Sequence, residues 1–174
     1  ENAYLRQTNS ISKFSDRYVY FKSDLGASFE SHAYFNAGKF YNGDNRPKFG
    51  YILNDGEQQL YFFIDTNDYW EIKNIGLATR TNGRNAEEAC GDMNQRGGGN
   101  FAKAAAENAD INKDGKFNIC DLVYFENVYK FYVEDYLYCT YDASFFTKEV
   151  SIGLFAFNTQ LNVKNPTLNL GGNN

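Results

Sequence analysis

The stretch FNICDLVYFENVYKFYVEDYLYCTY, residues 117–141, decides the fold of this chain. It is rich in Phe, Tyr and Val, which favour strands over helices. Two polar dipeptides, Glu126–Asn127 and Glu134–Asp135, divide it, and each has the length of a tight hairpin loop. The stretch therefore predicts three consecutive strands, over 117–125, 128–133 and 136–141.

The same pattern continues on both sides of this stretch. Period-two alternation predicts further strands over 18–23, 28–36, 48–54, 59–65, 70–79, 150–157 and 161–169. In the second of these, Phe29, Ser31, Ala33 and Phe35 share one face. Between the third and the fourth, Asn54–Asp55–Gly56 is a tight-turn signal. Short strands separated by turns predict an all-β fold, a two-sheet antiparallel β-sandwich.

Residues 82–109 interrupt this alternation. They are rich in Gly, Ala and Asn and include the helix-favouring run AKAAAEN. We therefore expect a short helical insertion, made of helices and loops, at about 82–116. A length of 174 residues suits one domain, so residues 1–174 are predicted to form a single β-sandwich domain that carries this insertion.

The composition excludes several classes of partner. The formal net charge is −5 and no cluster of Lys and Arg is longer than two residues, which argues against nucleic acid and against anionic lipid. No apolar run approaches the roughly 18 residues of a membrane-spanning helix, so no membrane partner is expected. Abundant Asn, Tyr and Asp suit a neutral, hydroxyl-rich partner such as a glycan; a polar surface without a ligand is the alternative.

The cysteines and the one histidine carry little chemistry in the sequence. Three cysteines allow at most one internal disulfide, and their spacings match no zinc pattern. Cys120 could pair with Cys139 if their strands are neighbours, or both could be buried thiols. His32 lies on a predicted strand without a signalled partner, so a structural role is expected for it rather than catalysis.

Three segments together resemble a laminin-G-like, concanavalin A-like β-sandwich. They are FESHAYFNAGKF…RPKFGYILNDGEQQLYFFID, LVYFENVYKFYVEDYLYCTYD and VSIGLFAFNTQLNVKNPTLNL. The resemblance covers roughly residues 28–80 and 117–170. It implies a jelly-roll-like arrangement of the two sheets, and it brings no functional residue with it.

Residues 110–121 place oxygen-bearing side chains at positions 1, 3, 5, 9 and 12 of a loop, with Gly at position 6, a spacing that suits Ca²⁺. The string resembles one calcium-loop repeat of a dockerin, a module that binds a protein partner. The resemblance implies side-chain ligands at Asp110, Asn112, Asp114, Asn118 and Asp121, and a backbone ligand at Lys116. Dockerins carry two repeats, only one is found here, and the following residues read as strands. A plain turn is the alternative.

Two clusters place aromatic residues beside polar ones at predicted loop edges. Aromatic side chains can stack on sugar rings while polar neighbours hold the hydroxyl groups. The candidate carbohydrate-binding residues are Trp70, Tyr69 and Asp68 in one cluster, and Tyr41 and Asn42 in the other. Packing of Trp70 in the core is the alternative.

The sequence predicts no enzyme. It lacks the closely spaced acids of concanavalin A-like glycosidases and the G-x-S-x-G, H-E-x-x-H and phosphate-loop motifs. The expected function is non-catalytic, lectin-like carbohydrate binding in a secreted or cell-surface bacterial protein. A protein–protein adhesion or scaffold module and a glycoside hydrolase remain as alternatives.

Overall fold

The computed structural model describes residues 18–22, 24–40, 48–66, 72–81, 84–89, 117–157 and 159–171. Strands and one 3₁₀-helix account for most of them. The elements are β1 (Tyr18–Lys22), β2 (Phe29–Phe40), β3 (Lys48–Asn54), β4 (Gln58–Thr66), β5 (Ile72–Thr81), β6 (Arg84–Ala89), β7 (Asn118–Phe125), β8 (Val128–Val133), β9 (Tyr136–Asp142), η1 (Ala143–Phe145), β10 (Ser151–Phe157) and β11 (Thr159–Leu170).

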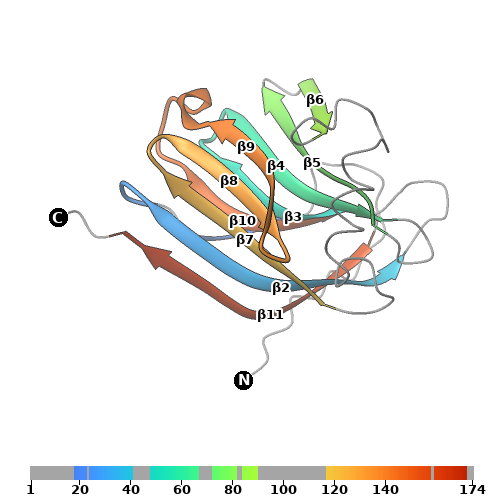
Figure 1. The fold of residues 1–174 in the computed structure, drawn as a ribbon. Coiled ribbons are helices and arrows are strands. Elements are labelled where there is room, and N and C mark those ends of the chain that lie inside the picture. The colour runs from blue at the N-terminus through green and yellow to red at the C-terminus, as the bar shows by residue number, and fades with distance from the viewer. Residues whose placement is uncertain are drawn as a thin grey trace.

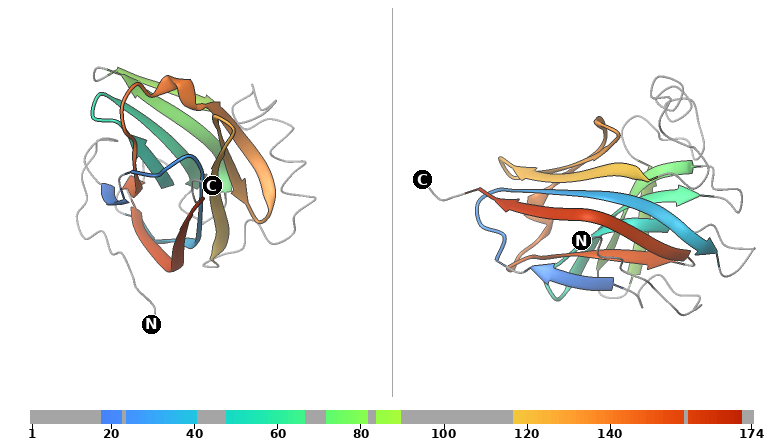
Figure 2. Two further views of the ribbon diagram at one scale, coloured as in Figure 1. Left: turned by 90° about the vertical axis from the view of Figure 1, so that its left-hand side faces the viewer. Right: turned by 90° about the horizontal axis from the view of Figure 1, so that it is seen from below.

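The strands form two antiparallel sheets packed face to face (Figure 1). One sheet has six strands in the order β1-β10-β3-β4-β5-β6, and the other has five in the order β11-β2-β7-β8-β9. Figure 2 shows the two layers from the end and from below. The predicted all-β, two-sheet sandwich is confirmed. None of the described segments is a helix that is long and apolar enough to cross a membrane.

Two-residue turns join the strands of the stretch at 117–141, as predicted. Glu126 and Asn127 have φ values of 50° and 62°, and Glu134 and Asp135 have 50° and 65°. Positive φ at both central residues is the type I′ geometry, whose twist matches that of the flanking strands. Asn and Asp tolerate this left-handed region better than most residues, so these dipeptides favour the hairpins.

The core lies between the sheets and follows the predicted alternation. Phe29, Ser31, Ala33 and Phe35 of β2 are all buried, which confirms their shared face. Tyr51 of β3 links the two layers, because its hydroxyl donates to the carbonyl oxygen of Cys120 at 3.1 Å. Burial raises the pKa of this tyrosine well above its usual value, so the hydroxyl stays neutral and available as a donor.

The outer face of the six-stranded sheet is also buried at its centre. A second apolar cluster there consists of Ile52, Tyr61, Phe63, Ala78 and Phe155. The rings of Tyr61 and Phe155 meet edge to face at 5.0 Å. Because these side chains are buried, the centre of this face does not offer a surface for a ligand.

Two predictions need correction. Residues Arg84–Ala89, expected in a helical insertion, form strand β6 and pair with β5. Backbone pairing at the sheet edge outweighs their weak strand propensity.

The option of a bridge between Cys120 and Cys139 is also wrong, because β8 separates their strands. Cys120 is a buried free thiol, whereas Cys139 is disulfide-bonded to a partner outside the described residues. The rest of the expected insertion, 90–116, lies outside the described part of the chain.

Candidate functional site

A pocket of about 360 Å³ opens at one end of the sandwich. Three segments meet around it, namely the connection between β1 and β2, the β7–β8 turn, and the segment from η1 to the start of β10. It is lined by Asp24, Leu25, Gly26, Phe29, Tyr124, Asn127, Tyr129, Ala143, Ser144, Phe146, Lys148, Glu149 and Val150. We refer to it as the end pocket. Its volume lies within the roughly 300–1,000 Å³ of typical small-ligand pockets.

Four aromatic residues belong to the lining of the end pocket. Three of them, Phe29, Tyr124 and Tyr129, come from the adjacent strands β2, β7 and β8. The strand register brings them together, because Tyr124 pairs with Phe29 on one side and with Tyr129 on the other. The ring centroids of Tyr124 and Tyr129 are 4.9 Å apart, and those of Phe29 and Tyr124 are 5.8 Å apart. Tyr129 is buried and Tyr124 is half-buried, so Tyr124 offers more of its ring to a ligand.

Burial raises the pKa of Tyr129, with smaller contributions from the charges of Tyr124 and Asp55. Its hydroxyl therefore remains protonated at neutral pH. The ring of Phe146 meets that of Tyr129 edge to face at 6.0 Å and extends the aromatic wall onto the segment after η1. The end pocket thus combines an apolar aromatic wall with a neutral phenol.

Polar groups occur around the same pocket. The polar residues of its lining include Asn127, Ser144, Lys148, Asp24 and Glu149. Polar groups of a small-ligand site fix the orientation of the ligand. Aromatic rings with hydrogen-bonding neighbours suit a sugar, which has an apolar ring face and peripheral hydroxyl groups.

The Asp55 carboxylate holds the pocket segment 143–150 in place. Its Oδ2 accepts a hydrogen bond from the backbone N–H of Thr147 at 3.1 Å, while its Oδ1 accepts from the N–H groups of Glu57 and Gln58 at 3.0 and 2.8 Å. Burial by itself raises the pKa of Asp55, but these backbone hydrogen bonds outweigh it and the pKa lies below its usual value. The ionised carboxylate therefore ties the β3–β4 turn to the pocket wall.

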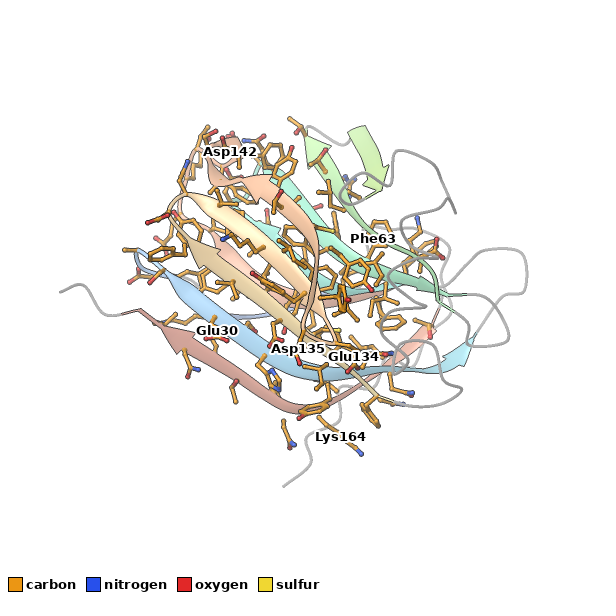
Figure 3. The ribbon with its side chains drawn as sticks, in the orientation of Figure 1. Glu30, Phe63, Glu134, Asp135, Asp142 and Lys164 are labelled. Atoms are coloured by element: carbon orange, nitrogen blue, oxygen red, sulfur yellow. The ribbon has the colours of Figure 1, made fainter. Side chains whose placement is uncertain are left out.

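Asp142 and Asn127 organise the neighbouring part of the wall. The Asp142 carboxylate accepts a hydrogen bond from the N–H of Ser144 at 2.8 Å and caps η1, which lowers the pKa of Asp142. The side-chain amide of Asn127 donates to the Asp142 carboxylate at 3.2 Å, and the backbone carbonyl oxygen of Asn127 accepts a hydrogen bond from the N–H of Ala143. These contacts connect the β7–β8 turn to η1, and Figure 3 shows Asp142 at this end of the sandwich.

The outer face of the five-stranded sheet carries a second polar arrangement. Nδ1 of His32 lies 2.6 Å from Oδ1 of Asp121, which stands directly opposite it in the β2–β7 register. The ring of Tyr34 meets the imidazole edge to face at 5.2 Å. Sequence reasoning missed this partner of His32. Because only the register of the two strands places Asp121 there, nothing in the local sequence could have signalled the pair.

The predicted sugar-binding residues Asp68, Tyr69, Trp70, Tyr41 and Asn42 lie outside the described residues. The strand ends that flank them belong to β2, β3, β4 and β5. Those ends lie at the opposite end of the sandwich from the end pocket (Figure 1). The structure therefore presents a site that the sequence did not indicate, and leaves the predicted cluster as a prediction.

The predicted calcium ligands are only partly described. Asp110, Asn112, Asp114 and Lys116 lie outside the described residues, whereas Asn118 and Asp121 are on β7. Asn118 is buried and Asp121 contacts His32. In the described part of the chain no group of three or more His, Cys, Asp or Glu residues is arranged to hold a metal ion. Calcium binding by 110–121 therefore remains a prediction.

No family model matches the chain. Among curated proteins, a segment of 22 residues is 91% identical to component C subunit beta of the glycine/sarcosine/betaine reductase complex of Peptoclostridium acidaminophilum. That match covers 13% of this chain and only 4% of the length of the relative. Such a short segment carries no argument about fold or function.

Solved structures share the fold at low sequence identity. The carbohydrate-binding module CBM66 of Bacillus subtilis matches with a TM-score of 0.55 and 12% identity, over 95% of this chain and 94% of that one. CG-16, a homodimeric agglutinin from chicken liver, matches with a TM-score of 0.52 and 8% identity, over 87% and 98%. The GH43 protein BlXynB of Bacillus licheniformis matches with 0.52 and 10%, over 84% of this chain but 28% of that one. At these identities the likeness shows the β-sandwich fold.

Proposed function

We propose that this chain is a non-catalytic carbohydrate-binding module and that its glycan binds in the end pocket. The observation that carries the proposal is the combination, in one pocket of about 360 Å³, of the Tyr124 ring with the polar groups of Asn127 and Ser144. The aromatic ring would pack against the apolar face of a sugar, and the polar groups would bind its hydroxyl groups. The shared fold with a carbohydrate-binding module and an agglutinin supports this reading.

Replacing Tyr124 with alanine is expected to weaken glycan binding about tenfold or more, because a pocket-lining aromatic residue is a frequent binding hot spot. The measurement is a glycan array followed by isothermal titration with the glycans that bind. Tyr124→Phe should retain most of the affinity, since it keeps the ring.

Tyr132→Ala is the matched control, because Tyr132 is a half-buried tyrosine on β8 that faces the outer side of the same sheet. It should leave the affinity unchanged. Loss of binding in Tyr132→Ala with full binding in Tyr124→Ala would move the site to that outer face and contradict the proposal.

Under this proposal the chain binds the glycan without hydrolysing it. Incubation with a panel of polysaccharides should release no reducing sugar. Sustained release by wild-type protein that disappears in Tyr124→Ala would instead establish the glycoside hydrolase alternative.

A secreted or cell-surface location is part of the proposal and is supported by the disulfide of Cys139, because disulfides persist in oxidising compartments.

The calcium prediction has its own test. If 110–121 binds Ca²⁺, titration of the wild-type chain with calcium should give a binding heat and raise the melting temperature, since binding to the folded state stabilises it. Asp114→Ala should abolish both effects. No heat and no thermal shift in excess calcium would leave 110–121 as a plain turn.

A further inference from the structure

The charges that line the end pocket are unbalanced. Two exposed acidic residues, Asp24 and Glu149, belong to its lining, and neither has a hydrogen-bond or ion-pair partner among the described residues. Lys148 is the lysine among the described lining residues, and its ammonium group already contacts the Oε1 atom of Glu57 on the β3–β4 turn. Among the described lining residues, two acids therefore accompany one lysine whose charge Glu57 already matches.

Aromatic rings add to this negative character. The face of an aromatic ring carries partial negative charge and attracts a cation within about 6 Å of its centroid. Tyr124 and Phe146 line the pocket together with the two acidic residues, and their rings contact those of Phe29 and Tyr129, which also belong to the lining. Carboxylates beside aromatic faces favour a ligand that is apolar on one side and positively charged at its edge.

We propose that the end pocket selects a sugar residue that bears a protonated primary amine, as in glycans of 2-amino-2-deoxyhexose. The apolar face of the sugar packs on Tyr124, and its ammonium group lies among Asp24, Glu149 and the aromatic faces. A uronic acid in the same position places its carboxylate against two carboxylates and is repelled. This inference rests on the proposed function and adds the class of sugar.

The test compares three oligosaccharides of equal length by isothermal titration with the full chain. They are a glucosamine oligomer, its N-acetylated form and a galacturonic acid oligomer. N-acetylation keeps the sugar backbone and removes the positive charge. At about pH 6, where primary amines of this kind are protonated, the glucosamine oligomer should bind about five- to tenfold more tightly than the N-acetylated form. The galacturonic acid oligomer should show no binding, and added salt should reduce the preference for the amine.

The double variant Asp24→Asn with Glu149→Gln should reduce the preference for the glucosamine oligomer over its N-acetylated form to less than about twofold, because it removes both charges that attract the ammonium group. Asn is compatible with the φ of 58° at position 24. Asp135→Asn is the matched control, because Asp135 is an exposed acid in the β8–β9 turn, away from the pocket (Figure 3). It should keep the full preference.

The outcomes separate the two proposals. Equal binding of the amino and N-acetylated oligomers, or tighter binding of the uronate, overturns the inference while the proposed function stands. A preference that survives the double variant also overturns it. If free lysine competes as strongly as the glucosamine oligomer, the pocket recognises an amine and no sugar, and the inference fails. If no glycan of the array or of this set binds, the proposed function itself fails.

Discussion

Replacing Gly50 with alanine is expected to prevent the sandwich from folding. Gly50 lies in the middle of β3, between β10 and β4. A Cβ atom at this position would stand 2.0 Å from the carbonyl oxygen of Phe62. That oxygen belongs to the backbone of a central strand, so it cannot move away without breaking the sheet. We expect a loss of more than about 4 kcal/mol, in the range of exceptional single substitutions, measured by urea denaturation and circular dichroism.

Gly56→Ala is the matched control for this clash. Gly56 lies in the exposed β3–β4 turn with φ of 95°, and a Cβ atom there meets nothing within 4 Å. Its replacement carries only the cost of an unfavourable backbone conformation, about 1–3 kcal/mol. The Gly56→Ala protein should therefore fold. A Gly50→Ala protein that is as stable as Gly56→Ala would show that β3 and β4 do not approach each other as described.

Replacing Asp55 with alanine is the second large effect, and it acts on stability and on the end pocket together. The substitution removes the acceptor of three backbone N–H groups, those of Glu57, Gln58 and Thr147. A hydrogen bond to a charged group contributes about 1.5–3 kcal/mol. Because Glu57 and Thr147 are exposed and their N–H groups can bond to water instead, we expect a net loss of about 3 kcal/mol and not three full contributions. Loss of the contact with Thr147 should also weaken glycan binding, because it loosens the part of the pocket wall that carries Phe146.

The pH dependence follows from the direction of the Asp55 pKa. Its value in the folded protein lies below its usual value, so the unfolded state takes up a proton first as pH falls. The stabilisation is present above the unfolded pKa of about 4 and is lost as pH falls through the folded pKa. Urea denaturation from pH 7 down to pH 2.5 should show this loss. Asp55→Asn should flatten the curve in that range.

Glu57→Gln is the control on the same turn. Glu57 and Lys148 form an ion pair whose side chains are both more than half exposed, so water and salt screen it and its loss should change stability far less than the loss of Asp55. If Glu57→Gln destabilises the protein as much as Asp55→Ala, the anchor of the pocket segment is the surface ion pair and not the carboxylate of Asp55.

Local pattern was sufficient to predict most of the strands. Residues 128–133 were expected to form a strand and do so with the same bounds, and the turn at 134–135 follows the same local logic. Strand β6 was missed because its residues, RNAEEA, have neither strand propensity nor clear alternation. Its strand conformation comes from pairing with β5, an interaction that no local window contains.

The end pocket was missed for a related reason. Asp24, Tyr124 and Phe146 line it from three separate segments. The sequence shows each of them as an ordinary residue near a turn, and sequence reasoning selected instead the clusters in which aromatic and polar residues are neighbours in the chain. The His32–Asp121 pair is a similar case, with 89 residues between its partners.

By itself, the sequence determined that this chain forms strands with one apolar face each and that such strands must stack as two sheets. That follows from a period of two residues, which any short window displays. Only the tertiary structure decided which turns meet at one end of the sandwich, that the Asp55 carboxylate contacts segment 143–150, and that Asp24 and Glu149 line the same pocket as the aromatic residues. Those neighbours are set by strand order and register, because pairing joins residues far apart in the chain.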